Sequence, residues 1–175
     1  METKISILSK FFEDPESEFH IREIARLTRI NHTTVRQVLN KLVKEGLLTS
    51  KKEKLYVSYK PVIFGKYLNL KLFYNLEKLR ESRIIDDLER YYDYPVIILF
   101  GSYAKGRDTK KSDIDICIIS NINKEFKTDK YIKLLNREIS IHYFTINRWK
   151  DAINKNPGLI NNICNGLVLS GELEV

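Results

Sequence analysis

The chain has 175 residues and a formal net charge of +7, and 43% of its residues are hydrophobic. This length suits one globular domain or two small ones. No run approaches the eighteen or so apolar residues of a membrane span, and no secretion signal is recognisable, so we expect a cytoplasmic protein without a membrane partner. The two cysteines, Cys117 and Cys164, exclude a disulfide framework.

The positive charge is concentrated in the first third of the chain. Residues 20–60 contain ten Lys and Arg against three Glu. Such clustering is typical of a surface that meets a polyanion, and it also occurs on faces that are merely solvated.

Apolar spacing predicts short helices over residues 4–12 and 20–28. A third helix is expected to begin after Asn31, a favourable N-cap, and to end at Gly46. Residues 47–61 are predicted to form two short strands around a lysine-rich turn. The order of these elements over residues 4–60 resembles the winged helix-turn-helix family, and "TTVRQVLNKLVKEGLL" resembles its recognition helix and wing entry.

The resemblance implies a double-stranded DNA-binding domain at residues 1–61. The predicted inward stripe of the third helix is Val35, Val38, Leu39 and Leu42. Short polar and basic groups are then left for base edges and phosphates, with wing lysines that add affinity but no sequence reading. These candidate DNA-binding residues are His32, Thr33, Thr34, Arg36, Gln37, Lys41, Lys51, Lys52 and Lys54. The alternative is a small helical domain for protein contacts or dimerisation.

Residues 62–92 carry apolar residues at helical spacing and are predicted to form a helical connector. From residue 93 to residue 175 the pattern alternates between strands and helices. Strands are expected at "PVIILFGS", "DIDICIIS" and "REISIHYFT", with helices near residues 124–136, 148–154 and 158–165. The whole chain is predicted to be α+β, with a winged helix followed by a mixed sheet flanked by helices.

The stretch from Leu99 to Ile119 combines features of a phosphate and metal site. Gly101 ends an apolar strand and lets the backbone approach a ligand, and Ser102 can offer its hydroxyl and amide at the start of a following helix. Asp113 and Asp115 are expected on one face of the next strand, where side chains alternate. Two neighbouring carboxylates repel each other unless cations lie between them, so a divalent cation is expected here.

Gly101-Ser102 followed by "SDID" at residues 112–115 resembles the polymerase-β-type nucleotidyltransferase superfamily, most closely its minimal members. The resemblance implies transfer of a nucleotidyl group from a nucleoside triphosphate, with ATP favoured, to a hydroxyl. It implies that Asp113 and Asp115 carry Mg²⁺ or Mn²⁺ and act in catalysis. The phosphate-binding candidates are Gly101, Ser102, Lys105, Arg107 and Ser112.

Members of the superfamily usually add a third carboxylate on the next strand. Here the aligned position holds Ser140. Glu138 would supply that carboxylate in a shifted register, and His142 is an alternative general base because imidazole titrates near neutral pH. Either residue can instead be structural.

Two functions therefore remain open. In one, the chain is an enzyme that modifies a protein side chain, a nucleic-acid end or a small molecule. In the other, it is a DNA-binding regulator, or an antitoxin-like protein with a toxin partner, whose nucleotidyltransferase domain binds nucleotide without turnover. A homodimer is compatible with either function.

Overall fold

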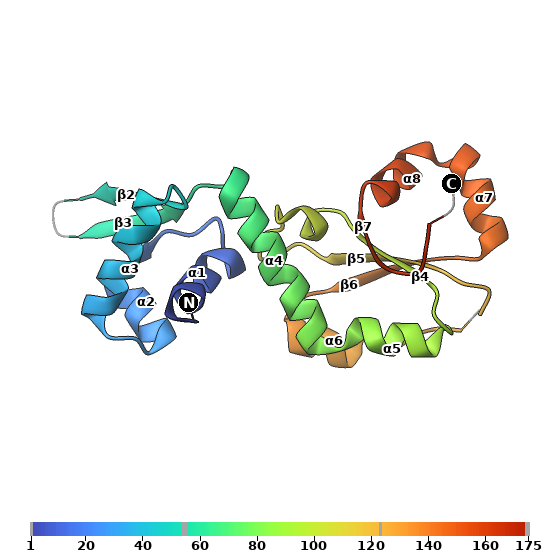
Figure 1. Ribbon diagram of the computed structural model, residues 1–175, viewed down its shortest axis with the longest axis horizontal. Coiled ribbons are helices and arrows are strands. Elements are labelled where there is room, and N and C mark those ends of the chain that lie inside the picture. The colour runs from blue at the N-terminus through green and yellow to red at the C-terminus, as the bar shows by residue number, and fades with distance from the viewer. Residues whose placement is uncertain (1, 54–55, 123, 174–175) are drawn as a thin grey trace. The chain divides into compact units, whose positions relative to one another are not determined.

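The computed structural model describes residues 2–53, 56–122 and 124–173 (Figure 1). The chain divides into two compact units, Met1–Tyr74 (unit 1) and Asn75–Val175 (unit 2), and each is described separately. The boundary falls within helix α4 (Gly65–Ser82). The fold class is α+β, as predicted, with helices and sheets in both units.

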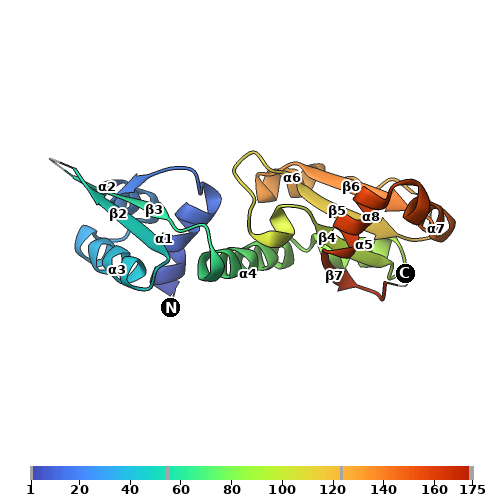
Figure 2. The same cartoon turned by 90° about the horizontal axis from the view of Figure 1, so that it is seen from above.

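Among its described residues, unit 1 has three helices and a three-stranded sheet before α4 begins. Their bounds are α1 Glu2–Glu13, β1 Phe19–His20, α2 Ile21–Thr28, α3 His32–Lys44, β2 Leu48–Lys52 and β3 Val57–Pro61. The strand order is β1-β3-β2, and both pairings are antiparallel. Figure 2 shows β2 and β3 side by side as a hairpin.

The ends of α3 are fixed by the residues that the sequence indicates. The side chain of Asn31 accepts a hydrogen bond of 2.8 Å from the backbone N–H of Thr34, which satisfies one of the free donors of the first turn. Gly46 adopts a left-handed conformation with φ of +73°. This conformation closes the C-terminus through the bond from Leu47 N–H to the Leu42 carbonyl. Both predicted ends of this helix are confirmed.

One hydrophobic core holds unit 1 together. Its fully buried side chains come from all three helices, from β2 and from the start of α4; they include Ile7, Leu8, Phe11, Ile24, Val35, Leu39, Leu42, Leu48 and Tyr67. The predicted inward stripe of α3 is therefore confirmed, with Val38 partly buried against the same core. The polar side of α3 faces outward as a consequence.

Unit 2 contains a four-stranded mixed sheet with helices on both faces. After α4 the bounds are α5 Ile84–Tyr91, β4 Val96–Phe100, β5 Ile114–Ile119, α6 Asp129–Leu135, β6 Ile139–Phe144, α7 Ile146–Lys155, α8 Pro157–Cys164 and β7 Leu167–Ser170. The strand order is β6-β5-β4-β7. β4 is antiparallel to β5 and β7, whereas β5 and β6 are parallel.

Alternation along the central strands divides the side chains between two cores. Leu99, Ile116 and Ile118 pack on one face with Leu88 of α5 and Tyr131 of α6. The other face packs against α7 and α8, and its buried side chains are Ile98, Phe100, Cys117, Ile119, Trp149, Ile160 and Ile163. Figure 1 shows the sheet between these two pairs of helices. Cys117 and Trp149 are both buried in this second core.

Two sequence-based boundaries need correction, and the predicted helical connector is resolved as two helices. Residue His20 belongs to β1 and precedes α2, although the spacing predicted it inside the helix. Helix α6 begins at Asp129 rather than near residue 124. Residues 62–92 form two helices because Arg83, with φ of +59°, interrupts the helical path between α4 and α5.

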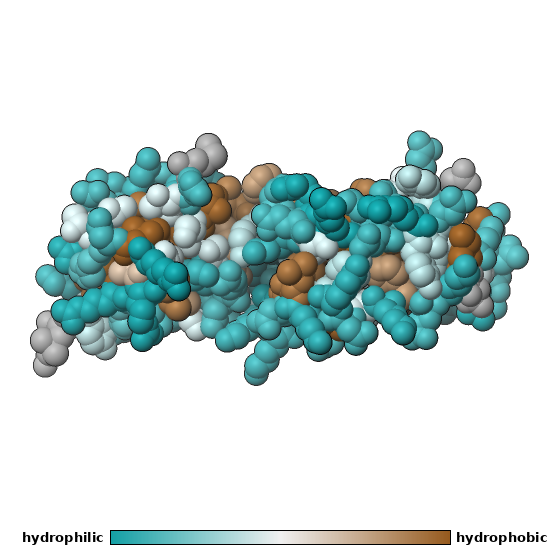
Figure 3. Space-filling view, turned by 90° about the horizontal axis from the view of Figure 1, so that it is seen from below, coloured by the Kyte–Doolittle hydropathy of each residue, from teal (hydrophilic) through white to brown (hydrophobic). Residues whose placement is uncertain are grey.

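The described surface gives no sign of a membrane span. Among the described residues, no helix has both the length and the apolar character needed to cross a bilayer. The face in Figure 3 is mostly hydrophilic, and hydrophobic residues appear on it as separate patches.

Candidate functional site

The turn after β4 brings the chain against the carboxylate of Asp115. Gly101 has a positive φ of +74°, a conformation that side-chain-bearing residues rarely adopt. A Cβ at this position would overlap Oδ2 of Asp115. Gly101 is therefore required twice, once for the backbone conformation and once for the space that the carboxylate occupies.

Asp115 lies in the second position of β5, between two neighbouring strands. Its register partners are Phe100 on β4 and Ser140 on β6. Burial raises the pKa of the Asp115 carboxyl, the positive potential of His142 lowers it, and the charge of Asp113 raises it. Asp113 and His142 thus both lie close enough to Asp115 to influence its ionisation.

Asp113 differs from its sequence-based placement. β5 begins at Ile114, so Asp113 precedes the strand instead of forming part of it, and its side chain is exposed. Asp115 is half-buried. The two carboxylates consequently have different environments although they are only two residues apart.

The segment after Gly101 is a tight turn rather than the start of an α-helix. Tyr103–Lys105 form a single 3-10 turn, η1, which corrects the expected helix after Ser102. The Ser102 carbonyl accepts hydrogen bonds from the backbone N–H groups of Lys105 and Arg107, at 3.1 and 3.0 Å. The side chains of Lys105 and Arg107 are exposed. Both cations are therefore available to a ligand at the turn.

Ser112 has a structural contact of its own. Its Oγ accepts a hydrogen bond of 2.9 Å from the backbone N–H of Thr109, and the two hydroxyl groups lie 3.4 Å apart. This arrangement closes the lysine-rich loop just before Asp113. Ser112 therefore forms hydrogen bonds within the loop, whereas the sequence predicted that it contacts phosphate.

A buried polar network that sequence reasoning missed holds this loop in place. Asp108 is 1% exposed, and its carboxylate accepts a hydrogen bond of 2.8 Å from Nδ2 of Asn75 on α4. The same Asn75 amide donates to the Tyr103 carbonyl at 3.0 Å. Arg137 forms an ion pair of 3.5 Å with Asp108 and donates to the Thr109 carbonyl. The network ties the loop to α4 and to the residues before β6.

The expected position of a third carboxylate is occupied by a hydroxyl and an imidazole. Ser140 pairs directly with Asp115 across the two parallel strands, and its Oγ lies 3.4 Å from Nε2 of His142. Glu138 is exposed and precedes β6. Within the described residues, no group of three His, Cys, Asp or Glu side chains is placed to hold a metal ion. Glu138 therefore does not complete such a group with Asp113 and Asp115.

The donor set of Asp113 and Asp115 nevertheless fits a hard divalent cation. Mg²⁺ is commonly held by one or two carboxylates, with substrate phosphates and water in the other positions. Burial already disfavours the charged form of Asp115. A nearby cation would offset that cost.

Residues 81–168, half of the chain, match the family described as "Nucleotidyltransferase domain". The chain belongs to this nucleotidyltransferase family. The match includes β4, the Gly101–Ser112 loop, β5 and β6. Nucleotidyl transfer is the activity that the family's description names.

Similarities to individual proteins were also found. A protein of Methanocaldococcus jannaschii named "Putative protein adenylyltransferase MJ0604" is 51% identical over 39 residues, which are 22% of this chain and 39% of that protein. The chain thus matches well under half of that relative's length. A solved structure of TrmBL2, described as an archaeal chromatin protein with a novel mode of DNA binding, is 13% identical. The structural match covers 89% of this chain and 68% of the TrmBL2 chain, and its TM-score of 0.29 supports no conclusion.

The candidate DNA-binding residues lie in unit 1, outside the region that matches the nucleotidyltransferase family. The candidate DNA-binding side chains that are exposed are His32, Thr33, Arg36, Gln37, Lys41, Lys51 and Lys52. Thr34 is half-buried, and its backbone N–H is used by the Asn31 cap. Lys51 forms an ion pair of 3.3 Å with Glu53. Lys54 lies outside the described residues. The polar face of α3 and the described part of the hairpin thus present most of the predicted groups to solvent.

Proposed function

We propose that the chain is a metal-dependent nucleotidyltransferase that transfers a nucleoside monophosphate from a triphosphate to a hydroxyl group. The observation that carries this proposal is the contact between Gly101 and the Asp115 carboxylate, within a segment that matches the nucleotidyltransferase family. The contact brings the Asp115 carboxylate next to a turn that also carries the exposed side chains of Lys105 and Arg107. Such a turn suits a triphosphate.

In this proposal the acceptor oxygen attacks the α-phosphorus, the bond to the bridging oxygen breaks, and pyrophosphate leaves with that electron pair. Asp113 and Asp115 would hold Mg²⁺ or Mn²⁺, which neutralises phosphate charge and stabilises the entering and leaving oxygens. Gly101 and Ser102 would bind phosphate oxygens together with Lys105 and Arg107. Ser112 would act on them through the loop that it closes.

The hydroxyl proton needs an acceptor on the protein. His142 is the better candidate, because it lies close enough to Asp115 to lower the pKa of that carboxyl. The Ser140 hydroxyl supports the His142 ring at Nε2. Glu138 is a weaker candidate for this proton acceptor, because it is exposed and precedes β6.

ATP as the nucleotide and a protein side chain as the acceptor are supported by the name of the M. jannaschii relative, a protein adenylyltransferase. The test is incubation of the purified chain with ATP labelled at the α-phosphate, Mg²⁺ or Mn²⁺, and lysate proteins. Label is expected on the chain itself or on one lysate protein. Asp113→Ala with Asp115→Ala should abolish it, whereas Asp151→Ala, an exposed carboxylate on α7, should not.

A second candidate function is favoured by one observation, namely that no three-residue metal group occurs within the described residues. In that case unit 2 would bind nucleotide without turnover, as in a regulator or an antitoxin-like protein. Titration calorimetry separates the two, since heat of nucleotide binding without label transfer from any of the four triphosphates would favour the regulator.

We also propose that unit 1 is a winged helix-turn-helix that binds double-stranded DNA. The order α1-α2-α3-β2-β3, the outward polar face of α3 and the excess of positive charge in residues 20–60 support it. Duplex affinity should fall steeply with salt because counterions are released on binding. Replacing Lys51, Lys52 and Lys54 together should flatten that dependence. Absence of duplex binding by the wild-type chain at low salt would contradict the proposal.

A further inference from the structure

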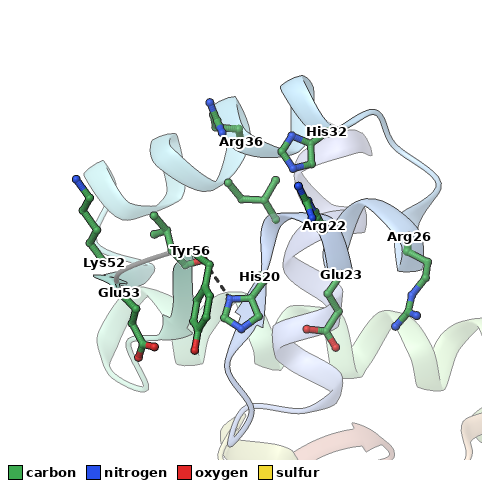
Figure 4. Close-up of a pocket in the computed structure, with 11 residues that line it drawn as sticks. His20, Arg22, Glu23, Arg26, His32, Arg36, Lys52, Glu53 and Tyr56 are labelled. Carbon is green, nitrogen blue, oxygen red and sulfur yellow. Dashed lines mark hydrogen bonds between the residues drawn. The ribbon is translucent and has the colours of Figure 1, made fainter.

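Unit 1 contains a groove of about 960 Å³ between α2, the first turns of α3 and the hairpin of β2 and β3 (Figure 4). Most of its polar lining is basic, with groups from β1, α2, α3 and β2. The basic side chains are His20, Arg22, Arg26, His32, Arg36 and Lys52. His20, Arg22 and Arg26 were not among the DNA-binding candidates. They extend the basic surface from α3 and the hairpin onto β1 and α2.

Within the described residues of unit 1, the arginines and the lysine of the groove have no acidic partner. Four lysines outside the groove are paired within the unit, in the pairs Lys4–Glu45, Lys10–Glu13, Lys51–Glu53 and Lys60–Glu18. Within the part of unit 1 that the structure describes, Arg22, Arg26, Arg36 and Lys52 form no ion pair. Their charge is therefore available to an external anion.

Both acidic residues of the lining are directed away from α3. In Figure 4 the carboxylates of Glu23 and Glu53 point to the side opposite α3, whereas Arg36 and Lys52 point toward the α3 side. Glu53 is further engaged by Tyr56 and Lys51, whose contacts hold the pKa of its carboxyl below the usual range. The α3 side of the groove is consequently the more cationic.

His20 is held in one orientation by its neighbours. Its Nδ1 lies 3.2 Å from the Val57 carbonyl, and its ring meets the Tyr56 ring edge-on with centroids 4.5 Å apart. A carbonyl oxygen can only accept a hydrogen bond, so Nδ1 carries the hydrogen of this pair. The ring can then contact an anion only by gaining a proton at Nε2.

We propose that this groove seats the phosphodiester backbone of duplex DNA, and that His20 takes up a proton at Nε2 when it contacts a phosphate. The inference rests on the proposed DNA binding of unit 1 and adds Arg22 and Arg26 of α2 as phosphate contacts. Because binding takes up a proton, duplex affinity rises as the pH falls.

Tyr56 and Glu53, which line the groove with His20, keep their charge between about pH 6 and pH 8. The hydrogen bond to Glu53 raises the pKa of Tyr56 above its usual value near 10, so Tyr56 stays neutral at and below pH 8. The lowered pKa of Glu53 keeps that carboxylate ionised. The other charged side chains of the lining are Arg22, Glu23, Arg26, Arg36 and Lys52, and its second imidazole is His32.

The experiment uses the full chain and a fluorescently labelled duplex, with affinity measured between about 50 and 200 mM salt and at about pH 6 and pH 8. Arg22→Gln with Arg26→Gln should lower the slope of log affinity against log salt by about 1.8, since each phosphate contact contributes about 0.9. The wild-type chain should bind roughly tenfold more tightly at the lower pH, and His20→Asn, which keeps a donor for Val57, should remove most of that gain.

Controls and alternative outcomes separate this inference from the proposed DNA binding. Lys150→Gln with Lys155→Gln removes the same charge from α7 and should leave slope and pH dependence unchanged. Absence of wild-type duplex binding would overturn the DNA-binding function itself. Wild-type binding with an unchanged slope in the arginine variant would overturn only the groove. A pH dependence that disappears in His32→Gln but persists in His20→Asn would overturn the assignment to His20. Tighter binding of single-stranded DNA would overturn the duplex as occupant.

Because His20 lies in β1, circular dichroism must first establish that His20→Asn is folded. His20→Gln provides a second variant if it is not. The arginine variant tests the groove independently of either.

Discussion

The backbone of Gly101 lies so close to the side chain of Asp115 that no other residue fits at position 101 without displacing the carboxylate. This contact links the turn after β4 to the second residue of β5. It makes the position of a candidate metal ligand depend on a residue that has no side chain. A substitution at Gly101 should therefore affect both stability and ligand binding.

We expect Gly101→Ala to destabilise unit 2 by about 1–3 kcal/mol, because it combines a positive φ with overlap on the Asp115 carboxylate. Urea unfolding followed by fluorescence of Trp149, the only tryptophan and a residue of unit 2, measures this. Gly158→Ala is the matched control, since a Cβ there meets nothing within 4 Å. Equal stability of the two variants would contradict the overlap.

Asp115→Asn should raise the melting temperature of unit 2 at pH 7 in the absence of divalent cations. Burial raises the pKa of Asp115, so the folded state retains this proton to higher pH than the unfolded state does. The carboxyl therefore favours folding at low pH, and its contribution is lost as the pH rises above the ordinary aspartate value near 3.9. The difference between variant and wild type should shrink towards that pH.

Addition of Mg²⁺ or Mn²⁺ supplies the complementary measurement. A cation that binds the folded site should raise the wild-type melting temperature and leave Asp115→Asn almost unchanged. If both proteins respond equally, Asp115 is not a ligand.

Arg137→Met should destabilise unit 2 by about 1–3 kcal/mol, because it removes one of the charged contacts of the buried Asp108 carboxylate. The same variant removes the hydrogen bond to the Thr109 carbonyl. Arg80→Gln breaks an exposed pair with Glu77 and should change stability by less than about 0.5 kcal/mol. A similar small effect of Arg137→Met would mean that the network does not hold the loop.

Asn31→Ala should lower the free energy of unfolding of unit 1 by about 1 kcal/mol, because it removes the hydrogen bond from Thr34 N–H at the start of α3. Unfolding followed by circular dichroism should shift, while the transition reported by Trp149 should stay in place. Asn69→Ala, an exposed position within α4, serves as the control and should not destabilise. A shift of the same size in both variants would argue against a specific capping role.

The sequence predicted the parts of the fold that depend on local rules. The α3 boundaries follow from Asn31 and Gly46, and strand alternation explains why Cys117 is buried. Asp113 was misplaced by one position because a strand end depends on pairing with its neighbours, and β6 pairs only from Ile114 onward. The segment after Ser102 could not be recognised as a single 3-10 turn from its composition.

In the candidate site, too, some residues are recognisable from the sequence and others only from the fold. Gly101 and Asp115 are recognisable from spacing, but Asn75, Asp108 and Arg137 are separated by 29 to 62 positions along the chain. Each reads as an ordinary polar surface residue until the fold brings them together. The groove of unit 1 was likewise hidden, because Arg22 and Arg26 lie on a helix that the resemblance does not assign to base reading.

The strand order of unit 2 has a consequence for how the protein is made. β4 lies between β5 and β7, yet β7 is the last strand of the sheet to leave the ribosome. Until then the nascent chain carries the apolar stretch Val96–Phe100 with one side unpaired, and such an edge invites pairing with other chains. Slow translation between β5 and β7 should therefore lower the yield of soluble protein, and chaperones that shield open strand edges should restore it.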